Sequence, residues 1–150
     1  MIDRRFRLVF LLFTCTLLAC SSETSAPRGS IGPESLTVAF QAFPDTVPAT
    51  GSLIVGAIAI NATSRMVFGR WETGRCGLTV RVFQPSGGAY ATVPPVCRGS
   101  GTWTMASGES TSTGLAIGGS GWPRGTYRIR AQVEAVNSQS PAIERTVVLP

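Results

Sequence analysis

The chain lacks two of the side chains on which much protein chemistry depends. Its 150 residues include no histidine, and all 13 basic residues are arginine, so lysine is absent too. Without histidine, a histidine base, a triad built on histidine and a histidine-ligated metal site are excluded. Charged residues make up only 14% of the sequence, against about 25% in an average globular protein.

Acidic residues are scarce as well, with 8 in the whole chain. Two glutamates could still meet in space, as they do in glycosidases, but no spacing in the sequence suggests it. Glu134 and Glu144 fall in strand-like segments and are expected at solvated positions. We therefore predict that the protein is not an enzyme and that it uses no cofactor and no metal.

Residues 1–19 have the composition of an export signal. Three arginines lie within the first seven residues, and an uncharged, mainly apolar run covers residues 8–18. This run is too short to cross a bilayer, which needs about 20 residues, but it suits the core of a signal peptide. It ends in Leu17-Leu18-Ala19-Cys20, which resembles the lipobox of bacterial lipoproteins.

The lipobox resemblance implies cleavage between Ala19 and Cys20 and acylation of Cys20, which would anchor the mature chain to a membrane. Ser21 is not the aspartate that resembles an inner-membrane retention signal, so we expect the outer membrane of the bacterial cell envelope, where the host has one. The alternative is a plain secretory signal that happens to contain Cys20. The mature chain would keep a net charge of +3, which together with an envelope location argues against a nucleic-acid partner.

The mature chain divides into a tether and one domain. Residues 20–33 are rich in Ser, Thr, Pro and Gly without an apolar period, which predicts a flexible tether. Residues 34–150 have roughly the length of one sandwich domain, about 100 residues. Apolar alternation or β-branched runs indicate nine strands, at residues 36–41, 53–62, 65–71, 78–82, 90–93, 102–105, 113–117, 127–135 and 143–149.

Two of these strands are particularly informative. Residues 127–135 alternate strictly between apolar and polar side chains, as expected for a strand with one face on a core and one in water. Residues 53–62 form a mainly apolar run, which predicts a central strand buried on both faces. Short strands between Gly-rich and Pro-rich turns predict an antiparallel β-sandwich of about seven to nine strands.

Cys76 and Cys97 would be the two cysteines besides Cys20 in the mature chain, and in an exported protein they predict a disulfide. The turn-forming residues 85–88 lie midway between them. A hairpin turning there would place Cys76 opposite Cys97 and Val80 opposite Val93. In the chain-entropy model the bridge would stabilise the fold by about 3 kcal/mol. The alternative, two free thiols in a metal or redox site, has no Cys-x-x-Cys spacing to support it.

Five short motifs follow one another between residues 61 and 127. They are Asn61-Ala62-Thr63, Cys76-Gly77-Leu78-Thr79-Val80, Ser86-Gly87-Gly88, Ser107-Gly108-Glu109 and Pro123-Arg124-Gly125-Thr126-Tyr127. Their order resembles the immunoglobulin-like domain family of a bacterial intracellular proteinase inhibitor. The resemblance covers about residues 50–150 and implies an immunoglobulin-like sandwich. No inhibitory loop can be matched, so proteinase inhibition is one hypothesis among several.

Four residues are candidates for a binding surface, namely Trp122, Arg124, Arg128 and Arg130. Trp122 lies among glycines and is expected to be the exposed tryptophan, able to stack on a sugar or anchor a partner. The arginines share one strand face or lie just before it, and could bind lipid headgroups or polysaccharide. The favoured alternative for them is a solvated face whose charges prevent aggregation.

Two further aromatic residues are expected to be structural. Trp71 is the tryptophan expected in the core. Tyr127 could belong to a binding site, but its place at the start of a late strand favours a tyrosine corner. The sequence thus predicts a lipid-anchored, non-enzymatic binding or accessory module, whose partners are the membrane and an envelope protein or glycan. A proteinase-inhibitor-like module and a glycan- or anionic-surface-binding module are the alternatives.

Overall fold

Nine β-strands build the domain in the computed structural model, which describes residues 25–41, 45–47, 51–93, 98–136 and 138–150. The strands are β1 (Thr37–Phe40), β2 (Ser52–Ile60), β3 (Val67–Glu72), β4 (Gly77–Phe83), β5 (Ala89–Val93), β6 (Ser100–Met105), β7 (Ser110–Gly118), β8 (Gly125–Glu134) and β9 (Ile143–Leu149). Within the described ranges the only helical element is one 3-10 turn, Pro33–Ser35. The predicted all-β fold is confirmed, and each of the nine predicted segments contains a strand.

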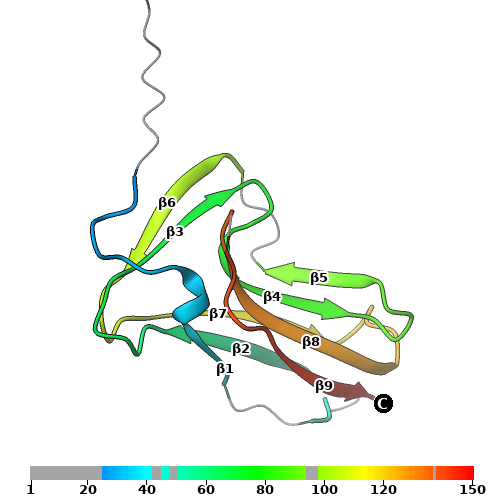
Figure 1. Cartoon of the computed structure of the whole chain (residues 1–150). Coiled ribbons are helices and arrows are strands. Elements are labelled where there is room, and N and C mark those ends of the chain that lie inside the picture. The colour runs from blue at the N-terminus through cyan, green and yellow to red at the C-terminus, as the bar shows by residue number, and fades with distance from the viewer. Residues whose placement is uncertain (1–24, 42–44, 48–50, 94–97, 137) are drawn as a thin grey trace, which may run out of the picture.

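The strands form two layers and one additional pair (Figure 1). One layer has the order β1-β2-β7, the other has the order β5-β4-β8-β9, and β3 pairs with β6. All these pairings are antiparallel. The layers correspond to strands A-B-E and C′-C-F-G of an immunoglobulin sandwich. The predicted immunoglobulin-like sandwich is therefore confirmed.

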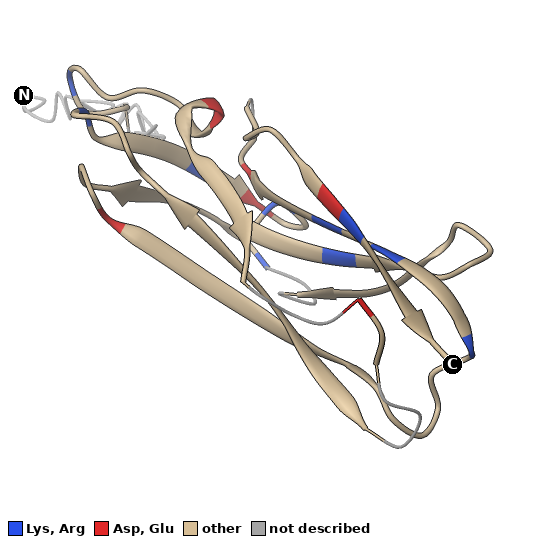
Figure 2. Cartoon of the chain, turned by 90° about the horizontal axis from the view of Figure 1, so that it is seen from below, with Lys and Arg blue, Asp and Glu red and all other residues tan. Residues whose placement is uncertain are grey.

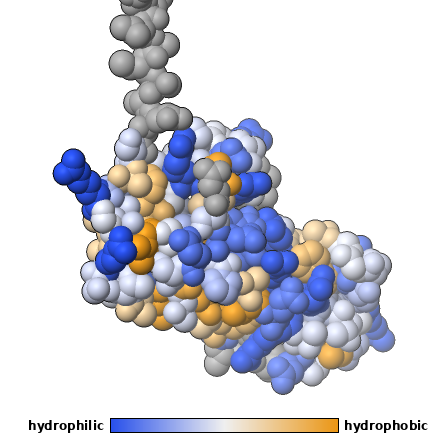
Figure 3. All heavy atoms as spheres, viewed as in Figure 1, coloured by the Kyte–Doolittle hydropathy of each residue, from blue (hydrophilic) through white to orange (hydrophobic). Residues whose placement is uncertain are grey.

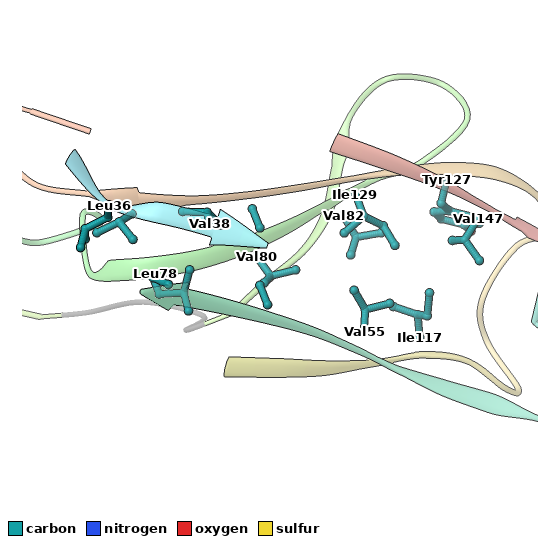
Figure 4. Packing of buried hydrophobic residues seen from close by; sticks show 14 of the residues in the cluster. Leu36, Val38, Val55, Leu78, Val80, Val82, Ile117, Tyr127, Ile129 and Val147 are labelled. Carbon is teal, nitrogen blue, oxygen red and sulfur yellow. The ribbon is translucent and has the colours of Figure 1, made fainter. Parts of the chain in front are cut away.

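The core lies between the two layers and follows from the alternation in β8. Tyr127, Ile129 and Ala131 have no exposed surface, because they face the core from every second position of that strand. In Figure 4, Ile129 and Val82 of one layer face Val55 and Ile117 of the other. Burying each large aliphatic side chain of this kind stabilises the fold by about 1.5–3 kcal/mol.

Strand β2 is central, as predicted, but only one of its faces is fully covered. Val55, Ala57 and Ala59 have no exposed surface and face the opposite layer. Ile54 is 70% exposed, and Ile58 is half-buried. The prediction that β2 is buried on both faces was wrong, because one layer of a two-layer sandwich covers only one side of each strand.

The predicted hairpin of β4 and β5 forms with the predicted register. Val80 lies opposite Val93, and the turn closes through hydrogen bonds between Gln84 and the glycines at 87 and 88. A register shift between Val82 and Phe83 adds a bulge that the symmetrical hairpin did not foresee. Cys97 lies outside the described residues, so its disulfide with Cys76 stays a prediction.

Tyr127 forms the predicted tyrosine corner. Its ring is fully buried, and its hydroxyl donates a hydrogen bond of 2.7 Å to the carbonyl oxygen of Pro123, four residues earlier. The ring centroids of Tyr90 and Trp122 lie 6.0 Å and 5.4 Å from its own. This hydroxyl therefore fastens the turn before β8 to the strand itself.

Replacing Tyr127 with phenylalanine should destabilise the fold by about 1 kcal/mol near neutral pH, because one hydrogen bond is lost. The variant should also respond differently to alkali. Burial raises the pKa of the Tyr127 hydroxyl above its usual value of 10.0, with a smaller contribution from Tyr90. This contribution to stability is complete below the unfolded pKa, about 10, and is lost as the pH rises through the folded pKa.

Urea unfolding between neutral pH and about pH 11 checks this prediction. The stability of the wild type and that of the Tyr90→Phe variant should both fall in alkali. Tyr90→Phe serves as the control because it removes an exposed hydroxyl, which donates a hydrogen bond to the carbonyl oxygen of Gly121. Tyr127→Phe should weaken less. A parallel decline in all three proteins would show that the buried hydroxyl is not responsible.

Candidate functional site

A polar hollow of about 630 Å³ opens on the outer face of the β5-β4-β8-β9 layer. We call it the arginine hollow, and its polar lining includes Arg75, Arg81, Arg130, Gln132, Glu134 and Gln139. Figure 3 shows hydrophilic residues gathered over the middle of the visible face, where Figure 1 places β4 and β8. Figure 2 shows that the strand charges concentrate on one layer. The hollow is therefore a shaped surface on which polar side chains are concentrated.

Three neighbouring strands bring these side chains together. The even-numbered residues of β8 face outward, because the odd-numbered ones fill the core. The antiparallel register places Arg81 of β4 directly opposite Arg130, and Glu144 of β9 opposite Arg130 on its other side. Gln132 and Glu134 follow Arg130 on the same face. The strand register alone therefore assembles the floor of the hollow.

Glu134 and Arg81 form a two-point ion pair in this floor. The Arg81 Nη1 lies 2.7 Å from Glu134 Oε1, and Nη2 donates to Oε2 at 2.8 Å. Glu134 is only 5% exposed although it lies on an outer face. The expectation that Glu134 is solvated was wrong. The facing guanidinium compensates the buried carboxylate with matched, charge-assisted hydrogen bonds.

Gln132 links this ion pair to Arg130. Its Oε1 accepts a hydrogen bond of 3.1 Å from Arg130 Nε, and its Nε2 donates to Glu134 Oε1. A second, longer contact of 3.5 Å joins Nε2 to Gln139 Oε1. Gln132 is 5% exposed, so the network holds it in one orientation. The floor of the hollow is therefore a fixed set of polar groups.

Arg130 is the member of this network that is left available to a ligand. Its Nε is used by Gln132 and lies 4.0 Å from Glu144 Oε1. Considering the described residues alone, its two terminal nitrogens have no hydrogen-bond or ion-pair partner. Its side chain is 36% exposed. A guanidinium held by Nε and open at its end is suited to a carboxylate or phosphate.

The structure does not bring the four predicted binding residues together. Arg130 lies in the arginine hollow, whereas Arg128 lies over the ring of Phe83, 4.8 Å from its centroid, and 3.9 Å from Glu144. Arg124 is exposed in the turn before β8. Trp122 is half-buried and packs against Tyr90, with 4.5 Å between ring centroids. The expectation that Trp122 is exposed was wrong.

The sequence-based prediction missed Arg75, Gln132 and Gln139. The polar run Arg128-x-Arg130-x-Gln132-x-Glu134 was the available signal, since all four residues share one strand face. Arg75 and Gln139 lie in the segments before β4 and after β8. Sequence spacing could not place these two in the hollow, because both lie outside the paired strands.

A second, more apolar pocket of about 480 Å³ lies beneath the β3–β6 pair. We call it the tryptophan pocket, since Trp71 and Trp103 line it together with Leu78 and Met105. Trp71 is half-buried and lies outside the core cluster, so its predicted core position was wrong. Trp103 packs against the core instead. Its ring lies so close to Gly69 that a Cβ atom added at Gly69 would be only 2.3 Å from Cε2 of the tryptophan ring.

The described residues hold no group of three or more acidic or cysteine side chains arranged to bind a metal ion. Among these same residues, no helix is sufficiently long and apolar to pass through a membrane. The chain matches no protein-family model, and it has no significant match among curated proteins.

Proposed function

We propose that this chain is a non-enzymatic binding module of the bacterial cell envelope, anchored through Cys20, that binds an acidic glycan in the arginine hollow. The observation that carries the proposal is the fixed guanidinium of Arg130, whose terminal nitrogens have no partner in the described structure. Three arginines face the hollow with one glutamate, and that glutamate is already neutralised by Arg81. The hollow therefore favours an anion.

The neutral groups around Arg130 suit a carbohydrate better than a bare ion. Gln132, Gln139 and Ser138 line the same hollow. Amide and hydroxyl groups both donate and accept hydrogen bonds, as sugar hydroxyls do. A sugar acid offers its carboxylate to the guanidinium fork and its hydroxyls to these neighbours. This combination of partners is why we favour an acidic glycan as the ligand.

The anchor in this proposal rests on the export signal and lipobox, which lie outside the described residues. Arg65 donates a hydrogen bond of 2.7 Å to the carbonyl oxygen of Gly29, and Ile31 pairs with β3. The tether free of the sandwich would thus run from Cys20 to about residue 28. Such a segment spans at most roughly 30 Å, so the domain would work close to the membrane surface.

Replacing Arg130 with alanine should weaken binding of polygalacturonate, a polymer of sugar acids, roughly tenfold or more. A hydrogen bond to a charged group contributes about 1.5–3 kcal/mol, which sets this scale. Isothermal titration of the detergent-solubilised chain, at fixed salt, would measure the affinity. Dextran, a neutral polymer, should bind poorly to both proteins.

Arg124→Ala is the matched control, because it removes the same charge from an exposed turn outside the hollow. Equal losses in Arg124→Ala and Arg130→Ala would indicate attraction by overall charge and contradict a binding site in the hollow. If the protein bound vesicles containing phosphatidylglycerol tightly but did not bind polygalacturonate, the ligand would be a lipid surface and not a glycan.

Two of the motifs on which the proteinase-inhibitor resemblance rests have structural contacts in this domain. The Ser107-Gly108-Glu109 turn closes through hydrogen bonds between Ala106 and Glu109. Asn61 is fully buried and donates to carbonyl oxygens of Arg65, Met105 and Ala106. These motifs are structural in this domain, and inhibition stays a prediction that an assay against a panel of proteinases would test.

A further inference from the structure

Strand β7 is an edge of its layer and lacks the usual protection of an edge. It pairs with β2 on one side, and no strand lies against its other side in the described part of the chain. This is the place that strand D occupies in an immunoglobulin constant domain. β7 is nine residues long and contains no charged residue and no proline. Natural edge strands usually carry such residues to prevent further strand pairing.

The tryptophan pocket lies beside this edge. Its walls come from β3, β4, β6 and β8, together with Cys76 before β4, Glu109 before β7 and Thr111 of β7. Thr111 lies on the core-facing side of β7, in phase with Leu115 and Ile117. No residue of β2 is among the described lining residues, so the pocket lies toward the open side of β7. An added strand would therefore run past the pocket mouth.

The pocket also contains an unused hydrogen-bond donor. The Nε1 of Trp103 is buried and has no partner among the residues that the structure describes. Leaving such a donor unpaired costs about 1–3 kcal/mol. A ligand carbonyl would satisfy this donor only if the Trp103 ring shifted, because the Nε1 atom is buried next to Gly69. The pocket thus offers mainly apolar walls for a side chain, with Thr104, Glu109 and Thr111 as polar members of its lining.

We infer that β7 accepts an extended segment of a partner protein as an additional strand, which inserts one apolar side chain into the tryptophan pocket. Main-chain hydrogen bonds to β7 would supply affinity, and the pocket would supply specificity, as in other cases of strand addition. Strands β1, β2 and β7 carry no charged residue, so the segment that fits this layer is uncharged. This inference does not depend on the arginine hollow, which lies on the other layer.

A second copy of the chain fits this edge less well than a separate segment. In a symmetrical pair, the β7 of the partner copy would have to offer its own core-facing side chains to the pocket. Ile117 has no exposed surface, and Leu115 packs against the core of its own domain. Neither can leave that core without opening it. The occupant is therefore a strand that has no core of its own to fill.

The test uses capped nine-residue peptides in which threonine alternates with valine and the central inward residue is phenylalanine. Hydrogen exchange of the full chain in detergent would report on β7, whose outward amides should exchange at least roughly tenfold more slowly with peptide bound. Two N-methylated peptides complete the design, because methyl groups on alternate residues block only one edge of the strand. One methylation pattern should abolish binding, and the other should preserve it.

Thr111→Trp and Ser112→Trp form the matched pair of variants. Thr111→Trp fills the pocket from β7, and affinity for the phenylalanine peptide should fall roughly tenfold or more, the scale of one buried aromatic side chain. Ser112→Trp adds the same side chain to the opposite face and should leave the affinity nearly unchanged. The pocket variant should keep its fold, since Thr111 is exposed at the pocket wall.

Three results would overturn the inference. Exchange in β7 could be unaffected by every peptide, both methylation patterns could weaken binding equally, or the two tryptophan variants could behave alike. If the amides of β7 exchanged more slowly at higher protein concentration in the absence of peptide, the partner at this edge would instead be a second copy of the chain.

Discussion

Replacing Cys20 with serine is expected to abolish acylation and release the chain from the membrane. The lipobox resemblance implies that the thiol of Cys20 is acylated, and a serine hydroxyl cannot replace that thiol. Two or three acyl chains give stable anchoring, because each buried methylene contributes about 0.8 kcal/mol. Incorporation of labelled palmitate and sedimentation with membranes should therefore both fall to background. No other single substitution in this chain is expected to have so complete an effect.

Cys15→Ser is the matched control for this experiment. Cys15 lies in the apolar run that would be removed with the signal, so its replacement should change neither labelling nor sedimentation. Mass spectrometry of the intact wild-type protein would also show directly whether Cys20 carries acyl chains. A soluble product with an unmodified thiol at Cys20 would establish the plain secretory signal and contradict lipid anchoring.

The strand pattern was predictable because it depends on local alternation. In β8 the apolar residues Tyr127, Ile129 and Ala131 have no exposed surface, as strict period-two alternation requires. The register of β4 and β5 was equally predictable, since a short turn fixes which residues face each other. Local chemistry thus determined both the strands and one of their pairings.

The exposure of individual side chains was less predictable. Ile54 is as apolar as the core residue Val55 beside it, yet it is 70% exposed. Trp122 lies in a glycine-rich turn, but Tyr90 of β5 packs against it. These outcomes depend on contacts between segments far apart in the chain, and a local pattern contains no information on such contacts.

The candidate site shows the same division between local and long-range information. The sequence indicated that Arg128 and Arg130 share a strand face. It could not show that Glu134 would be buried, because that burial depends on Arg81 from β4 and on the segment after β8. A charged residue in an alternating strand is usually solvated, and here a long-range ion pair reverses this expectation.

Replacing Arg81 with methionine should lower the free energy of unfolding by about 3 kcal/mol, the lower end of the range for breaking a buried ion pair. The lower end applies because the Arg81 side chain is 33% exposed, whereas that of Glu134 is only 7% exposed. The loss arises from the carboxylate of Glu134, which would stay buried with only Gln132 as a donor. Urea unfolding monitored by tryptophan fluorescence would measure it.

Arg128→Met is the matched control on the same sheet face. The pair of Arg128 and Glu144 is 3.9 Å apart, with 52% and 41% of the two side chains exposed. Its loss, together with the contact to Phe83, should cost about 1 kcal/mol or less. A similar cost for Arg81→Met and Arg128→Met would mean that the Glu134 carboxylate is not isolated from water in the folded protein.

The double variant Arg81→Met with Glu134→Met separates stability from specificity. Removing both charges also removes the need to compensate a buried carboxylate, so the double variant should return to within about 1 kcal/mol of the wild type. Arg130 would keep its contact with Gln132 but lose the charged floor that holds Gln132 in place. If the proposed site is correct, this stable variant should still bind polygalacturonate more weakly than the wild type. Full stability with unchanged affinity would show that the ion pair serves neither the fold nor the site.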